Sequence, residues 1–349
     1  MDTLKNECFV YQRQSDDDYK KLGLSKETVE LWEDGLRTDF ETNEFEWWYF
    51  DCELEDTSKI VITFFTKSYV IPTKGLDPFI RFNYSKPDGT EVARTLNFKA
   101  GDFSADKNSC DVKIGNNIFK GDLKNYNIHI EFEDYSFDIK LKNNFTAWRP
   151  HTGHYNFGTD YLAWVVPVPQ GEVLAEIREN GQVKNLKGHG YHDHNWGKVP
   201  MRDLIHHWYW GRAQVGPYLI IASCLYGEKQ YEYQFTNTFF IGRDGKILAD
   251  NGENSTLKIS DVVVEPETNK PVPNKLVFEY KDEQQNYRLT LERKRDILHQ
   301  PFHDEKGGAY LRFAGNALLE VKNQNETSSY NETAIWEEMY FGLSINTEK

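Results

Sequence analysis

The chain has 349 residues, a formal net charge of -14 and an aromatic content of 15%. A single hydrophobic core stops growing at about 250 to 300 residues, so this length predicts two domains of ordinary size. The acidic excess excludes nucleic acid as a partner, because a phosphate backbone requires a cationic face.

The N-terminal residues 15–37 carry the clearest helical pattern of the chain. Apolar residues such as Tyr19, Leu22 and Trp32 recur among charged ones, and Ser25 stands before Lys-Glu-Thr as a helix cap would. The segment therefore predicts one or two short helices.

Beyond Glu44 the sequence predicts strands, because short runs of aromatic and β-branched residues alternate with turn residues. In the first half the predicted strands are Glu46 to Glu53, Lys59 to Val70, Phe79 to Tyr84, Ile128 to Phe132 and Ser136 to Leu141. In the second half they are Leu204 to Val215, Tyr218 to Leu225, Tyr231 to Ile241, Leu276 to Tyr280, Tyr287 to Arg293, Ala309 to Val321 and Ala334 to Ser344. Hairpin turns are predicted at 86–90, 115–117 and 243–245.

Strands with almost no helix between them indicate an all-β fold of antiparallel sandwiches or barrels. The stretch 197–203 interrupts two aromatic strands near the middle of the chain. We therefore predict an N-terminal β domain over residues 1–203, which includes the helical leader, and a C-terminal β domain over residues 204–349.

Cysteine spacing and hydropathy indicate the cellular compartment in which the protein is expected. The four cysteines form no CxxC pair, and the N-terminus lacks an apolar stretch behind a basic start. No apolar run approaches the 18 residues of a membrane span. These features predict reduced thiols, a cytoplasmic location and no transmembrane segment.

The first aromatic cluster is Glu46-Trp-Trp-Tyr-Phe-Asp51. On a strand, Glu46 and Trp48 share one face with Phe50, while Tyr49 and Asp51 share the other, so each face combines rings with a carboxylate. The cluster is interpreted either as a core strand with carboxylates at its edge or as one wall of a ligand cavity. In the second interpretation Glu46, Trp48 and Tyr49 bind substrate.

The central segment runs Gly188-His-Gly-Tyr-His-Asp-His-Asn-Trp-Gly197. Its histidines resemble a metal site, but on a strand only His192 and His194 point the same way. A complete set of metal ligands would need His206 or His207 in addition. We predict no metal and no cofactor, and we expect the histidines to form hydrogen bonds.

Tyr191 and Asp193 project together from the other face of this segment. An acid among apolar rings has its charged form disfavoured and keeps a proton for donation, as protonation of an alkene requires. Aromatic faces then stabilise the resulting cation. The alternative is that Asp193 is a buried acceptor that ties backbone amides at a strand end.

The third cluster is His206-His-Trp-Tyr-Trp-Gly-Arg212. Trp208 and Trp210 face one side of the predicted strand, followed by Arg212, and they are candidate substrate contacts. Arg212 is interpreted either as such a contact or as a structural ion-pair partner. Trp164, which lies upstream of the central segment, adds another ring.

In this order and spacing, the three clusters resemble the carotenoid 1,2-hydratase (hydroxyneurosporene synthase) family. Its wider group includes kievitone-hydratase-like proteins and fungal lipocalin-like Diels-Alderases. The resemblance covers about residues 44 to 215, and it implies two lipocalin-like β domains packed together around a hydrophobic ligand. It also implies that Asp193 in the Tyr-x-Asp element is the proton donor and that no redox cofactor is needed. The upstream His-x-Trp element of that family is replaced by Leu162-Ala-Trp164, so the resemblance leaves open whether the substrate is an acyclic carotenoid or another molecule.

The leading functional hypothesis is a cofactor-independent hydratase or dehydratase that acts on an isoprenoid-type double bond. Asp193 is its general acid, Tyr191 orients the acid, and His192 or His194 positions water. Trp48, Trp164, Trp208 and Trp210 line the site in this hypothesis. A pericyclase or cyclase that shapes a polyene is the second hypothesis, and a protein that binds a hydrophobic small molecule without reaction is the third.

Overall fold

The computed structural model describes residues 9–302, 305–323 and 327–344. The chain divides into two compact units. The N-terminal unit contains residues 12–155 and 160–201. The C-terminal unit takes residues 202–349 with the short segments 1–11 and 156–159, as far as these are described.

Two short helices open the N-terminal unit, α1 (Asp16–Leu22) and the 3-10 helix η2 (Leu31–Asp34). The Ser15 side chain caps α1 by accepting the backbone N–H of Asp18, whose carboxylate accepts the N–H of Ser15 in return. The predicted N-terminal helical segment is confirmed, but the predicted cap is wrong. Ser25 accepts two backbone N–H groups in the bend between α1 and η2, and it begins neither helix.

The remainder of the N-terminal unit is β structure. Its strands are β1 (Val10–Gln12), β2 (Glu44–Leu54), β3 (Lys59–Phe65), β4 (Phe79–Ser85), β5 (Glu91–Asn97), β6 (Phe103–Ala105), β7 (Cys110–Ile114), β8 (Asn117–Gly121), β9 (Asn125–Phe132), β10 (Tyr135–Asn143), β11 (His154–Phe157), β12 (Asp160–Glu179) and β13 (Gln182–Lys198), with the 3-10 helix η3 (Ala100–Asp102) before β6. Strands β1 and β11 cross the boundary between the units. The all-β class is thus confirmed.

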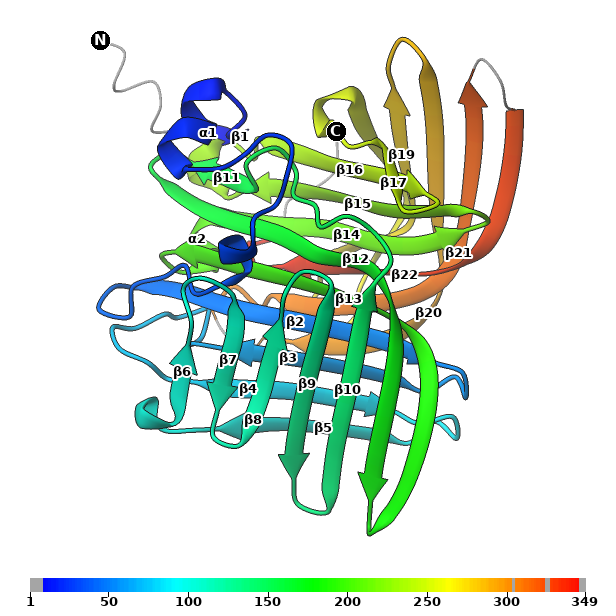
Figure 1. Ribbon diagram of the computed structural model, residues 1–349. Coiled ribbons are helices and arrows are strands. Elements are labelled where there is room, and N and C mark those ends of the chain that lie inside the picture. The colour runs from blue at the N-terminus through cyan, green and yellow to red at the C-terminus, as the bar shows by residue number, and fades with distance from the viewer. Residues whose placement is uncertain (1–8, 303–304, 324–326, 345–349) are drawn as a thin grey trace. The chain divides into compact units, whose positions relative to one another are not determined.

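The N-terminal sheet runs in the order β5-β4-β3-β2-β13-β12-β10-β9-β8-β7-β6. It curls so that strands β6 to β10 lie across strands β2 to β5 (Figure 1). Rings from the two halves meet inside, as Phe64 does with Phe119 and Phe82 with Phe137, at 5.7 and 4.7 Å between ring centroids. The interior of the curl is therefore a packed aromatic core.

The C-terminal unit repeats this construction with fewer strands. They are β14 (Ile205–Val215), β15 (Tyr218–Gly227), β16 (Phe235–Arg243), β17 (Lys246–Ala249), β18 (Ser255–Val264), β19 (Pro271–Lys281), β20 (Gln285–Pro301), β21 (Ala309–Asn323) and β22 (Thr327–Tyr340), with the short helices η4 (Lys229–Tyr231) and η5 (Gly252–Asn254). The short helix α2 (Met201–Leu204) begins at the last residue of the N-terminal unit. Their order is β17-β16-β15-β14-β22-β21-β20-β19-β18. Around Trp336, Phe313 and Leu291 this sheet encloses a core of its own.

In each unit the first long strand pairs antiparallel with the last one, β2 with β13 and β14 with β22. We call the β2–β13 pair the seam of the N-terminal unit. In its register His194 lies opposite Trp48, and Asp193 lies opposite Tyr49. The seam therefore joins the first aromatic cluster of the sequence to the central segment.

The three predicted hairpin turns are confirmed between β4 and β5, β7 and β8, and β16 and β17. Gly89, Gly115 and Gly245 have positive φ angles of 86°, 61° and 75° in these turns, which is the conformation that favours glycine. Cys52, Cys110 and Cys224 are buried and take part in no disulfide among the described residues, and Cys8 lies outside those residues. In the described part of the chain, no helix has the length and hydropathy to cross a membrane.

Candidate active site

Strand β13 has both of its faces buried along residues 190–197. One face presents Asp193 between Tyr191 and Asn195, and both neighbours hydrogen-bond to it. The other face presents His192 and His194 toward the interior of the N-terminal unit. The predicted separation of the acid from the two histidines is confirmed, because side chains alternate along a strand.

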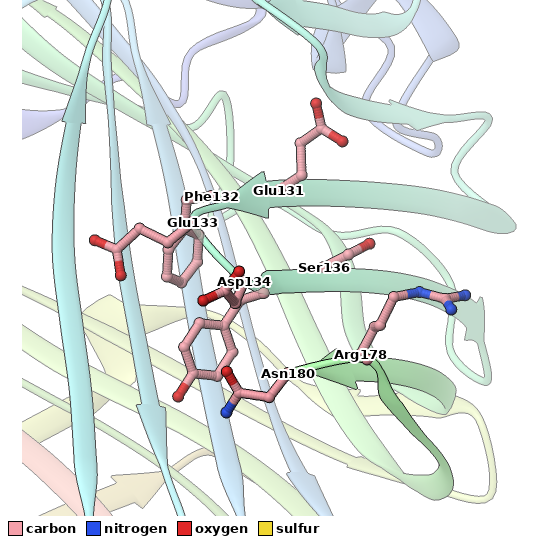
Figure 2. A pocket seen from close by; sticks show the side chains of 9 residues that line it. Glu131, Phe132, Glu133, Asp134, Ser136, Arg178 and Asn180 are labelled. Carbon is pink, nitrogen blue, oxygen red and sulfur yellow. The ribbon is translucent and has the colours of Figure 1, made fainter.

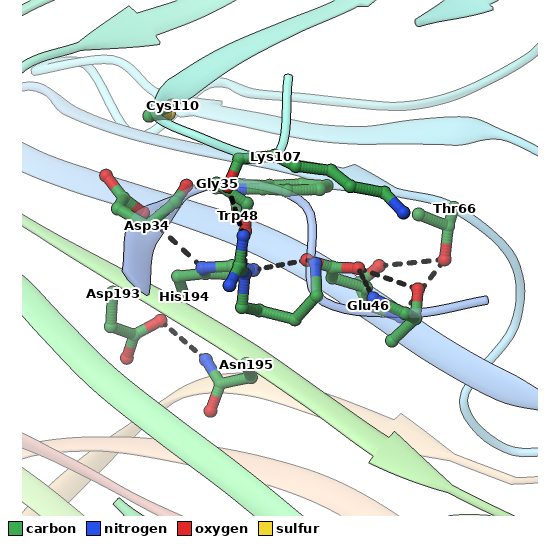
Figure 3. Close-up of polar contacts among 12 residues, drawn as sticks. Asp34, Gly35, Glu46, Trp48, Thr66, Lys107, Cys110, Asp193, His194 and Asn195 are labelled. Atoms are coloured by element: carbon green, nitrogen blue, oxygen red, sulfur yellow. Dashed lines mark hydrogen bonds and ion pairs between the residues drawn. The ribbon is translucent and has the colours of Figure 1, made fainter. Parts of the chain in front are cut away.

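Asp193 accepts three side-chain hydrogen bonds within the N-terminal unit. Its Oδ2 accepts one from the Tyr191 hydroxyl at 2.8 Å and one from the Trp164 indole N–H at 3.1 Å. Its Oδ1 accepts one from the Asn195 amide at 2.8 Å (Figure 3). The carboxyl group is thus fixed in orientation, and 9% of the Asp193 surface stays exposed.

Burial raises the pKa of Asp193 to about 7. The hydrogen bond from Tyr191 is the largest opposing effect, and His192 and Trp164 also lower this pKa, whereas the neighbouring carboxylate of Asp51 raises it. The acid form of Asp193 is therefore well populated near neutral pH, as a general acid requires.

Ring surfaces surround the carboxyl group on this face. Trp164 meets Trp148 edge-on at 5.7 Å between ring centroids, and Tyr49 meets Tyr191 edge-on at 6.2 Å. The Tyr49 hydroxyl also donates to Asp51 at 2.9 Å. The predicted combination of an acid with aromatic rings is present here, and Trp164 contributes an N–H donor as well as a ring.

On the opposite face of the seam the two histidines contact two buried carboxylates. Figure 3 shows His194 between Asp34 and Glu46. His192 Nε2 lies 3.1 Å from Asp34 Oδ2, and its Nδ1–H donates to the backbone carbonyl of Tyr49 at 2.8 Å. His194 Nε2 lies 2.7 Å from Glu46 Oε1. All four side chains belong to the interior of the N-terminal unit, and the predicted water-positioning role of the histidines stays a prediction.

Trp48 and Glu46, two predicted substrate contacts, also point into this interior. Trp48 stacks on His194 at 4.6 Å and donates its indole N–H to the backbone carbonyl of Asp34. Both residues have no exposed surface. The contacts observed for Trp48 and Glu46 are core contacts, whereas Tyr49 lies on the Asp193 side of the seam.

Asp34, Cys110 and His192 are the residues of this interior that could hold a metal ion. Each offers a ligand atom, and these atoms lie within 4.8 Å of one another. Asp34 Oδ2, however, accepts the Tyr126 hydroxyl at 2.5 Å, and the Cys110 thiol donates to the Phe119 carbonyl at 3.6 Å. We interpret the cluster as a hydrogen-bonded network of the core.

The remaining predicted contacts, Trp208, Trp210 and Arg212, belong to the C-terminal unit. They occupy alternate positions of β14 and are half-buried, whereas Tyr209 between them is part of the core. Trp208 Nε1 donates to Glu337 Oε1 at 3.2 Å. The alternation that the sequence predicted is confirmed, and the role of these three residues in substrate binding stays a prediction.

Two residues of the site carry roles that sequence reasoning missed. Asn195 projects from the same face of β13 as Asp193, and a period of two places it within reach of the carboxyl group. Asp34 is the last residue of η2 and lies 158 residues before its partner His192 in the sequence, so no local pattern could have joined them.

A surface hollow of about 740 Å³ lies at the hairpin ends of the N-terminal sheet (Figure 2). Charged and amide side chains line much of it, including Glu131, Glu133, Asp134 and Arg178. None of the predicted site residues lines this hollow. Its polar walls do not suit a hydrophobic ligand.

A family profile described as Diels-Alderase-like matches residues 121–310, which is more than half of the chain. Hydroxyneurosporene dehydrogenase of Chlorobaculum tepidum is 29% identical over 203 residues, or 48% of this chain. That match spans 53% of the relative's own length.

Two solved structures share the fold. CghA in complex with Sch210972 superposes with a TM-score of 0.64 and 15% identity, over 96% of this chain and 99% of that one. Kievitone hydratase from Nectria haematococca gives a TM-score of 0.54 and 12% identity, over 85% of this chain and 89% of that one. The profile match and the shared all-β architecture show that the chain belongs to the Diels-Alderase-like family.

Proposed function

We propose that the protein adds water to, or removes it from, a double bond of a hydrophobic isoprenoid-type molecule, with Asp193 as the general acid. The observation that carries this proposal is the Asp193 carboxyl group, buried among rings and oriented by Tyr191 and Trp164. The names of two similar proteins, a hydroxyneurosporene dehydrogenase and a kievitone hydratase, support a substrate of this kind.

The reaction proceeds by proton transfer. Asp193 gives its proton to the less substituted alkene carbon, which forms a C–H bond and leaves a tertiary cation at the other carbon. The faces of Tyr49, Tyr191 and Trp164 stabilise this cation without trapping it. Water adds to the cation and releases a proton that restores the acid form of Asp193, so that the net change is the addition of one water molecule.

The rate of this reaction is expected to fall as pH rises through about 7. The step needs protonated Asp193, whose pKa burial raises to about 7, so kcat decreases about tenfold per pH unit above that value. The measurement is kcat between pH 5 and 9 with neurosporene as the probe, and circular dichroism at each pH shows whether the fold persists. A flat profile over this range would contradict the assignment of the acid.

The family itself favours a second candidate function, a pericyclase that folds a polyene for cyclisation. Product analysis in D2O separates the two candidates. Hydration adds the mass of one water molecule and places deuterium on carbon, whereas a pericyclic reaction changes neither the mass nor the deuterium content of the carbon skeleton.

A further inference from the structure

The interior of the C-terminal unit contains a carboxyl group that makes no hydrogen bond in the described part of the chain. Glu338 has no exposed surface, and neither of its oxygens has a partner there. It lies on β22 between Trp336 and Tyr340, on the face that carries the core, and its neighbour across the strand pair is Tyr209 on β14. A polar group buried in this way costs free energy. The stability of the fold therefore does not explain why an acid stands at this position.

The Glu338 side chain is a neutral carboxylic acid. Burial raises its pKa well above the usual range, and Tyr209 and Arg293 oppose this shift without cancelling it. In its acid form the group has one O–H to donate. That O–H requires an acceptor, and the core around it is formed by apolar and aromatic side chains.

A second polar group stands diagonally across the same pair of strands. Strand β14 bulges at His206, where its register with β15 shifts, and the bulge brings the Nδ1 atoms of His206 and His207 within 2.7 Å of each other. His207 lies opposite Tyr340, two positions along β22 from Glu338. Tyr226 from β15 and Tyr340 from β22 stack on the His207 ring at 4.3 and 5.1 Å between centroids. His207 is 7% exposed.

The hydrogen bonds of the two histidines determine which nitrogen carries each proton. His206 Nε2 lies 2.8 Å from the Leu343 carbonyl, which can only accept, so this nitrogen is protonated. Burial lowers the pKa of both imidazoles, and both are therefore neutral near pH 7. His206 Nδ1 must then accept from the Nδ1–H of His207, which leaves His207 Nε2 as an acceptor. The contact with His206 is the one hydrogen bond that His207 makes within the described residues.

We propose that Glu338 and His207 bind the hydroxyl group of a hydrophobic alcohol in the interior of the C-terminal unit. Glu338 donates its O–H to the alcohol oxygen, and the alcohol donates its own O–H to His207 Nε2. Diagonal positions on neighbouring strands are about 7–8 Å apart, and one oxygen bonded to both groups spans about 5.5 Å between them. The tyrosine rings around His207 offer apolar surface to the carbon skeleton. This site goes beyond the proposed function, because it shares no residue with the Asp193 site.

The pair of groups selects for an alcohol. A hydroxyl group both donates and accepts, so it satisfies the acid and the imidazole together. An ether or a ketone can accept from Glu338 but has no proton for His207. A buried acceptor that loses its donor costs free energy, so these analogues are expected to bind more weakly.

The test compares geraniol with geranyl methyl ether as probes of the full chain. The chain carries Asp193→Asn, so that acid catalysis at the other site does not consume the probe. Isothermal titration calorimetry at pH 7 measures Kd for both probes. We expect the ether to bind at least about tenfold more weakly than geraniol, as the loss of one buried hydrogen bond predicts. Equal affinities, or no binding of geraniol, would overturn the inference.

Three further variants in the same chain assign the two hydrogen bonds. His207→Phe keeps a ring between the tyrosines, and we expect it to abolish the preference for geraniol over the ether. Glu338→Leu is expected to weaken both probes, since each accepts from Glu338, whereas Glu338→Gln keeps an N–H donor and stays within a few-fold of the parent chain. Glu332→Leu is the matched control, because Glu332 is exposed on the same strand. It is expected to leave both affinities unchanged.

Thermal unfolding distinguishes a binding role of Glu338 from a structural one. Glu338→Leu removes a buried polar group that has no partner in the described residues, so we expect the melting temperature of the C-terminal unit to rise while geraniol affinity falls. A lower melting temperature with unchanged geraniol affinity would show that Glu338 serves the core and would overturn the inference. Should Glu338→Leu fail to fold, His207→Phe and the ether comparison still decide. Because every chain carries Asp193→Asn, none of these results depends on the proposed hydration.

Discussion

Replacement of Asp193 by asparagine is expected to lower turnover of neurosporene by about two to four orders of magnitude, the usual contribution of a general acid. The amide keeps the shape of the side chain, and its oxygen can still accept from Tyr191 and Trp164. It has no acidic proton to give, so the first step of hydration is lost. The measurement is kcat and KM for purified variant and wild type, with the hydrated product quantified by mass spectrometry.

The matched control is Asp138→Asn on β10. The Asp138 carboxylate is exposed and bonds to His129 at 2.8 Å, so this change removes an acid of the same unit without touching the seam. It is expected to leave kcat unchanged. Full turnover in Asp193→Asn would show that the acid is dispensable and would favour a mechanism based on the shape of the site.

Replacement of Glu46 by alanine is expected to lower the free energy of unfolding of the N-terminal unit by several kcal/mol, because each buried donor left without a partner costs about 1–3 kcal/mol. Oε1 accepts the Arg37 backbone N–H at 2.8 Å and faces His194, while Oε2 accepts from the N–H and hydroxyl of Thr38. Removal of the carboxylate leaves these buried groups without a partner, and each then costs free energy. Calorimetry that resolves the transitions of the two units measures the effect.

Glu53→Ala on the same strand is the control, because Glu53 is exposed and its ion pair with Lys59 spans 3.3 Å at the surface. Such a pair contributes at most about 1 kcal/mol. The sequence predicted that Glu46 binds substrate. A variant that unfolds like wild type but has a raised KM would support that prediction over a role in stability.

The local sequence pattern was sufficient to predict which side chains lie together on one face of β13. Because side chains alternate along a strand, Tyr191 and Asp193 could be placed together and separated from His192 and His194, and the contacts confirm this. The ring character of the site could also be predicted. The hydrogen bond from Trp164 to Asp193 could not be predicted, since the register between β12 and β13 depends on bulges near Val168.

Contacts between distant segments were beyond local reasoning. Asp34 gains its partners because η2 packs against the interior side of the β2–β13 pair. There the Asp34 carboxylate accepts a hydrogen bond from Tyr126 and contacts His192. Periodicity within one strand carries no information about such a partner.

The seam has a consequence for the order in which the N-terminal unit folds. It joins residues as far apart in sequence as Glu46 and His194, which are separated by 148 positions. Pairings of this length form slowly, because the entropy of closing the loop is lost before any contact compensates for it. Since Asp193 receives its neighbours from β12 and β2 only when this pairing is complete, we expect catalytic competence to be among the last properties that a refolding chain regains.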